Sequence, residues 1–170
     1  YLKDAKLDFK MQTAMGQGKE RDALRDKAKA VTKKMRDNYV EGRLGLVIDG
    51  TGKDYSKITS QANQLKQIGY DVHMVFINTS LDVALERNRN RARTVPEKIT
   101  IDSWNKVQKN IGAFQRFFGN KNFVIVDNNE ISDNVFDMVG KQVRRMLSKK
   151  VDNPTAKAWI ENELRKKRRT

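Results

Sequence analysis

The chain is predicted to fold as an α/β protein in which helices cover both faces of a parallel sheet. Three apolar runs, at residues 44–48, 71–77 and 123–127, have the length and the branched or aromatic side chains of buried strands. Helical patterns separate each run from the next, which favours parallel strands joined by crossovers. With 170 residues and 38% hydrophobic content, the chain is expected to bury one ordinary core.

Amphipathic spacing predicts three helices before the second strand. Residues 1–15 are expected to form a short helix, and residues 16–18 interrupt the pattern. A long helix at about residues 20–40 follows, with apolar side chains on one face by which it is expected to pack. The third helix, residues 56–67, closes at Gly69, since glycine readily takes the left-handed conformation that ends helices.

Two more helices are predicted between the second strand and the third. Thr79 and Asp82 form a capping box that opens the first of them. This helix is expected to run to about residue 93, because the residue before Pro96 disfavours helical backbone. Residues 101–118 repeat aromatic and branched side chains at helical spacing and are predicted to form the second helix.

The expected domain organisation is one α/β domain, residues 1–148, followed by a basic helix and tail, residues 149–170. A helix at residues 133–147 ends the domain. Asn153 then serves as the N-cap of a last helix that begins with a proline and runs to about residue 167.

The charge of the chain favours acidic partners. The net charge is +14, and more than half of the excess lies in residues 141–170, which contain eleven basic and three acidic side chains. This balance predicts binding to nucleic acid, nucleotides or another polyanion, although a basic terminus can also be merely solvated. The chain has no cysteine and no apolar run of membrane-spanning length. A cytoplasmic location without membrane contact is therefore expected.

Polar residues follow each predicted strand where it ends. Because ligands of parallel α/β sheets bind outside the carboxyl ends of the strands, these residues form the expected site. An apolar strand that stops on a carboxylate, here Asp49, points to phosphoryl transfer. The residues at the three strand ends are Asp49, Gly50, Thr51, Asn78, Thr79, Asp127, Asn128 and Asn129.

Two stretches that end in Gly-x-Gly-Lys, residues 16–19 and 50–53, suggest a phosphate loop but do not match its pattern. The second has Val47 where the loop needs glycine and Asp54 where it needs a serine or threonine. The first follows no predicted strand and fails at the same two positions. A true Walker A loop is therefore not expected in this chain.

Three segments together resemble the second half of P-loop kinases. They are Leu-Val-Ile-Asp-Gly-Thr at residues 46–51, the helix-to-strand join at residues 65–72, and the arginine-rich segment at residues 84–96. The similarity spans about residues 40–130 and is to the zeta-toxin-like and polynucleotide-kinase-like branches, including those carried by bacteriophages. The resemblance implies a three-layer P-loop NTPase-like fold that lacks its first strands. It also implies a kinase that uses ATP and Mg²⁺ and phosphorylates a nucleotide, a nucleic-acid end or a nucleotide-sugar.

The resemblance further implies roles for residues on the first predicted strand and its loop. Asp49 falls at the Walker B-like position, where such an acid orients Mg²⁺ through water. Thr51 and Lys53 lie on the loop that lines the acceptor pocket. These residues would act on the phosphates and on the acceptor.

Arginines fall where the resemblance places a lid that clamps the transferring phosphate. These are Arg87, Arg91 and Arg93, of which Arg87 and Arg91 are predicted to share a helix face at i and i+4. A guanidinium neutralises and positions a phosphoryl group at once. The carboxylate at residue 49 and these guanidinium groups are expected to converge on one crevice. The residues that the resemblance places near the adenine are Asp127, Asn128 and Asn129.

The chain also departs from the family pattern. The phosphate loop and the catalytic aspartate of the family have no counterpart and are expected to lie before Tyr1. The family's first strand would lie between residues 44–48 and 71–77, so either these two runs pair directly or another segment fills the place. By itself, this chain is expected to bind ATP poorly and to transfer no phosphate. The rival hypothesis is a non-enzymatic nucleic-acid-binding module that uses the tail, residues 149–170, and the arginine-rich helix.

Overall fold

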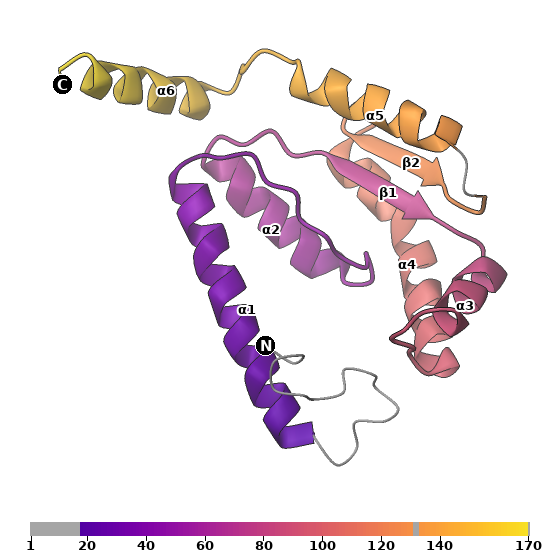
Figure 1. The fold of residues 1–170 in the computed structure, drawn as a ribbon. Helices are drawn as coiled ribbons and strands as arrows, with labels where there is room; N and C mark the ends of the chain where they lie inside the picture. Colours follow the sequence, from indigo (N-terminus) through magenta and orange to yellow (C-terminus); the bar gives the residue numbers. More distant parts are fainter. Residues whose placement is uncertain (1–17, 131–132, 170) are drawn as a thin grey trace. The chain divides into compact units, whose positions relative to one another are not determined.

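A computed structural model describes residues 18–130 and 133–169, and it shows a mainly helical α/β chain with one small parallel sheet (Figure 1). The helix expected at residues 1–15 lies outside the described residues. The elements in chain order are α1 (Gly18–Glu41), α2 (Tyr55–Gln67), β1 (Met74–Asn78), α3 (Leu81–Arg89), α4 (Glu97–Phe118), β2 (Phe123–Asp127), α5 (Asp133–Leu147) and α6 (Pro154–Lys167).

The chain divides into two compact units. The first comprises Tyr1–Gly50 and Leu81–Asp102, and it contains α1 and α3. The second comprises Thr51–Ser80 and Ser103–Thr170, and it contains the sheet, α2, most of α4, α5 and α6. The core of the molecule lies in this second unit.

The sheet consists of β1 and β2, which run parallel as the sequence predicts. Met74 pairs with Phe123 at one end of the ladder, and Asn78 pairs with Asp127 at the other. The two carboxyl ends are therefore level with each other. The strand β1 begins at Met74, so residues 71–73 of the predicted strand lie outside it.

The strand predicted at residues 44–48 is wrong. Residues 44–50 form neither helix nor strand, and Val47 is fully exposed at 101% of its reference area. A strand needs a neighbour for its backbone hydrogen bonds, and the sheet of the described residues has only β1 and β2. The direct pairing of residues 44–48 with residues 71–77 is therefore not found either.

The long helix α1 forms as predicted, but its apolar face is not buried. None of the residues of α1 is buried, and Val31, Met35 and Tyr39 of the expected packing face are each more than 40% exposed. Two residues after the end of α1, Arg43 takes the left-handed conformation with a φ of 53°. The Leu44 amide there donates to the Tyr39 carbonyl at 2.9 Å, which satisfies one of the last carbonyls of the helix.

Aromatic side chains form the core of the second unit. Phe114 and Phe118 of α4 cluster with Phe76 of β1 and Phe123 of β2, and Ala62 of α2 completes the cluster. The helices α2 and α4 thus pack over the sheet face that carries the Phe76 and Phe123 side chains. The helix α5 contacts β2, and Figure 1 shows it running beside that strand.

The last helix begins as predicted. Asn153 is the N-cap of α6, and its side-chain oxygen accepts hydrogen bonds from the amides of Thr155 and Ala156 at 2.9 and 3.4 Å. Ala156 lies directly against Gly69, whose φ is +101°. This contact fixes the start of α6 on the turn that ends α2.

His73, immediately before β1, is expected to make the stability of the second unit depend on pH. Its Nδ1 is buried and has no hydrogen-bond partner in the described part of the chain. Burial lowers the pKa of His73 from its ordinary value of 6.5, the charge of Lys149 lowers it further, and Asp71 opposes the shift. The folded state therefore favours the neutral imidazole.

Stability is expected to fall as the pH drops below about 6.5, because the unfolded chain then binds a proton that the folded chain resists. The stability that the neutral His73 contributes is lost completely once the pH is below the lowered pKa of His73 in the folded state. Urea unfolding at pH 7.5 and 5.0 tests this against His73→Gln, for which we expect a smaller loss between the two pH values. The shift assigned to His73 is wrong if the variant and the parent chain lose the same amount.

Among the helices of residues 18–130 and 133–169, none combines the length and the apolar character needed to cross a bilayer.

Candidate functional site

The carboxyl ends of β1 and β2 are tied together by a polar network in the second unit. The Asn128 amide donates to the Asn78 carbonyl at 2.9 Å, and the Ser80 amide donates to Oδ1 of Asn129 at 2.7 Å. Oδ1 of Asp127 accepts from both the amide and the side-chain nitrogen of Asn129, at 2.9 and 2.7 Å. The structure thus brings the predicted residues 127–129 together with the end of β1.

This network leaves the Asp127 carboxylate exposed while it organises the turn. Both polar atoms of the Asn129 side chain form hydrogen bonds: the nitrogen donates to Asp127, and the oxygen accepts from the Ser80 amide. Hydrogen bonds from side chains thus close this turn, and the turn places polar groups at the sheet edge where α/β proteins bind ligands.

Helix α4 supports the same edge with side chains that the sequence analysis did not select. Nε1 of Trp104 donates to the Thr79 carbonyl at 2.9 Å, and Nε2 of Gln108 donates to Oδ1 of Asn78 at 2.8 Å. Trp104 is one of the aromatic side chains that recur at helical spacing in residues 101–118, and that spacing predicts packing. The available signal was the i, i+4 spacing of Trp104 and Gln108, since such positions lie on one helix face.

The loop before α2 is also held by α4. Nδ2 of Asn110 donates to the carbonyls of Gly52 and Lys53 at 3.0 and 3.2 Å. Gly52 is buried with a φ of +75°, and a Cβ there would lie 3.6 Å from the ring of Phe76. The side chains of Thr51 and Lys53, both predicted to line an acceptor pocket, belong to exposed residues of this loop.

Asp54, at the position where a phosphate loop carries serine or threonine, is a helix cap. Its Oδ1 accepts the Lys57 amide at 3.0 Å at the start of α2. A helix N-terminus is the place where a phosphate loop holds its anion. In this structure the Asp54 carboxylate occupies the N-terminus of α2.

The arginine-rich segment lies in the first unit and differs from the prediction. The helix α3 ends at Arg89, four residues earlier than expected, and α4 begins at Glu97. Arg87 is half-buried on α3, whereas Arg91 is exposed beyond the helix end. The predicted shared helix face of Arg87 and Arg91 is therefore wrong.

The early end of α3 has a side-chain cause. Asn88 forms two hydrogen bonds with the backbone of Val95, which turns the intervening residues into a loop. Nε of Arg89 also binds Oε1 of Glu97 at 2.7 Å. Arg93, like Arg91, is exposed on this loop. These side-chain hydrogen bonds across the loop thus outweigh the helical propensity of the arginines.

Asp49 is an exposed residue of the first unit and, against expectation, does not end a strand. The predicted site residues fall into both units, with Asp49 and the arginines in the first and the residues 51, 53 and 127–129 in the second. No group of three or more histidine, cysteine or acidic side chains within the described residues could hold a metal by itself. The convergence of Asp49 with the arginines stays a prediction.

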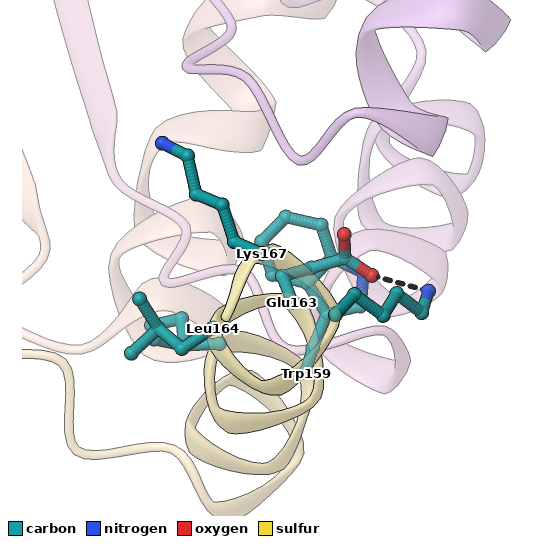
Figure 2. A pocket seen from close by; sticks show the side chains of 6 residues that line it. Trp159, Glu163, Leu164 and Lys167 are labelled. Carbon is teal, nitrogen blue, oxygen red and sulfur yellow. Dashed lines mark hydrogen bonds and ion pairs between the residues drawn. The ribbon is translucent and has the colours of Figure 1, made fainter. Parts of the chain in front are cut away.

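A shallow groove of about 450 Å³ runs along α6, and none of the predicted site residues lines it (Figure 2). Glu163 binds Lys166 at 2.7 Å on this surface. Two apolar side chains of the groove, Ile160 and Leu164, are 38% and 49% exposed. The remaining lining residues are Trp159 and Lys167.

Comparison with known families finds one match. The family model described as zeta toxin matches residues 9–137, which is more than half of the chain. A search of curated proteins and a search of solved structures find no match. The similarity to zeta-toxin-like kinases inferred from residues 40–130 is thereby confirmed for the family. The chain belongs to the zeta toxin family, which has the P-loop NTPase fold and a kinase-like, nucleotide-binding function.

Proposed function

We propose that this chain functions in ATP-dependent phosphoryl transfer to a nucleotide, a nucleic-acid end or a nucleotide-sugar. Family membership supports the kinase-like activity. Because neither stretch ending in Gly-x-Gly-Lys matches the phosphate-loop pattern, the 170 residues alone are expected to bind ATP weakly and to transfer no phosphate.

The arginine-rich segment is the observation that carries the proposal. Residues 87–93 contain an arginine at every second position. One of them, Arg89, is paired with Glu97, whereas Arg91 and Arg93 present exposed side chains. Phosphoryl transfer needs charge neutralisation and positioning more than covalent help, and a pair of guanidinium groups supplies both.

The acidic and hydroxyl residues fit a magnesium-bound phosphate. Mg²⁺ is commonly held by one or two carboxylates, several waters and the phosphates of the substrate, so a single exposed carboxylate is an adequate protein ligand. Asp49 would hold the ion through water, and Thr51 and Lys53 would face the acceptor. When bound, Mg²⁺ neutralises the negative charge of the phosphates. Residues 127–129 would contact the base.

Calorimetric titration of the full chain with MgATP at low salt tests this function. We expect weak binding that falls about tenfold in Arg91→Ala, because one charge-assisted phosphate contact is lost. Asp49→Asn should weaken MgATP binding while leaving metal-free ATP binding unchanged. Arg116→Ala, which removes an exposed arginine outside the segment, is the matched control.

Unchanged MgATP binding in Arg91→Ala would contradict the proposal. The alternative function, a nucleic-acid-binding module, is favoured by the exposure of every described basic side chain in residues 149–169. Oligonucleotide binding that requires residues 149–170 but not Arg91 would support that alternative instead.

A further inference from the structure

Asn88 closes the arginine-rich segment into a loop. It is the buried polar residue of α3, only 5% exposed, and it lies in the last turn of that helix. Its Nδ2 donates to the Val95 carbonyl at 2.7 Å, and its Oδ1 accepts the Val95 amide at 3.0 Å. The side-chain amide therefore pairs with a peptide group through two hydrogen bonds, as neighbouring backbones pair in a sheet.

A second tie reinforces this closure. Nε of Arg89, the residue after Asn88, binds Oε1 of Glu97, two residues beyond Val95, at 2.7 Å. Arg89 is thereby held at the base of the loop. The two remaining arginines of the loop, Arg91 and Arg93, are exposed.

Electrostatic repulsion among the arginines of the segment opposes the closure of the loop. Guanidinium groups at alternate positions repel one another, so an unrestrained segment has a lower electrostatic energy when these groups are farther apart. Here a buried amide and an ion pair hold the backbone closed instead. Keeping cations together in this way favours a ligand with several negative charges, because the loop is already ordered before the ligand arrives.

We propose that Asn88 is the positioning residue of this loop, and that the closed loop presents Arg91 and Arg93 together to an oligophosphate chain. The inference rests on the proposed phosphate role of the arginines. It adds a residue outside the predicted site set and names the part of the substrate that the loop contacts. Asn88 itself does not touch the ligand.

Titration of the full chain with inorganic tripolyphosphate tests the inference, since this probe carries the phosphates without a base or an acceptor. We expect Asn88→Ala to weaken tripolyphosphate binding about tenfold or more, because displaced contact groups lose their pre-organisation. Asn88→Gln retains the amide on a longer side chain and should lose less. Asn90→Ala, an exposed substitution in the same loop, should bind as the parent chain does.

Two further readouts separate positioning from contact. The Val95 amide should lose hydrogen-exchange protection in Asn88→Ala, because its acceptor is removed. The salt dependence of binding should keep its slope in Asn88→Ala and become shallower in Arg91→Ala, since only the latter removes a cation. Circular dichroism of Asn88→Gln establishes that the fold persists.

The possible results are distinguishable. If Asn88→Ala loses Val95 protection but binds tripolyphosphate like the parent chain, the positioning inference is wrong and the role of the arginines stands. If Arg91→Ala and Arg93→Ala both bind like the parent chain, the proposed phosphate role fails and the positioning inference fails with it. Weaker binding in Asn88→Ala with an unchanged salt slope supports the inference.

Discussion

Replacement of Phe114 by alanine is expected to lower the free energy of unfolding by about 3–5 kcal/mol, the usual range for a phenylalanine removed from a core. Phe114 is completely buried, at 0% exposure, in the cluster that joins α4 to the sheet and to α2. Its ring lies 5.3 Å from that of Tyr55 and 6.4 Å from that of Phe118, measured between centroids. The substitution therefore removes buried apolar area and two aromatic contacts at once.

Urea denaturation followed by circular dichroism measures this loss. Lys109→Ala is the matched control, because it truncates an exposed side chain on the same helix and should change stability by no more than about 0.5 kcal/mol. A loss below about 1 kcal/mol in Phe114→Ala would mean that the ring is not part of a packed core.

Gly69→Ala is expected to destabilise the second unit by about 1–3 kcal/mol from backbone strain, with a further loss from steric overlap. Gly69 has a φ of +101°, which side chains with a Cβ rarely adopt. A Cβ there would lie 2.8 Å from the backbone nitrogen of Ala156. Because this neighbour is backbone, the start of α6 would have to move.

Two other glycines serve as controls for Gly69→Ala. Gly119 also has a positive φ, of +74°, but a Cβ there meets nothing within 4 Å, so Gly119→Ala reports strain without overlap. Gly112 lies in α4 with only a flexible arginine nearby, and Gly112→Ala should stabilise by about 0.5–1 kcal/mol. Equal losses at Gly69 and Gly119 would show that the contact with Ala156 does not hold α6.

The groove on α6 and the exposed apolar face of α1 contribute no predicted phosphate ligand. The first is lined by residues of one helix, and the second consists of single apolar side chains such as Val31 and Met35. The proposed chemistry instead depends on residues 49–53 before α2, on the end of β2 and the turn that follows it, and on the loop after α3. Loops held by a rigid scaffold are where binding residues usually lie.

Several features of the fold could be predicted from local sequence because their causes are local. The strands β1 and β2 follow from runs of branched and aromatic side chains, and the cap of α6 follows from Asn153 before a proline. The polar residues at the strand ends were predicted as a site because parallel strands bring their carboxyl ends to one edge. The network of Asn78 with residues 127–129 agrees with that placement.

Other features depended on partners that lie outside the element concerned. Residues 44–48 have the composition of a strand, but a strand exists only where another strand accepts its hydrogen bonds. The helix expected to reach residue 93 ends at Arg89, because Asn88 bonds to Val95 across the loop. Gln108 and Asn110 were not selected, since their role depends on which backbone carbonyl or amide lies opposite them after folding.

The sequence by itself therefore determined the types of the elements apart from residues 44–48 and the parallel pairing of β1 with β2, since these depend on periodicity and composition along the chain, and the family was indicated by its resemblance to zeta-toxin-like kinases. Only the tertiary structure decided that residues 44–48 stay unpaired, that α3 stops early, and that Gln108 and Asn110 bind the end of β1 and the loop before α2. These outcomes rest on hydrogen bonds and burial between particular groups. Each of these groups could bond to several partners, and the three-dimensional arrangement decides which partner it bonds to.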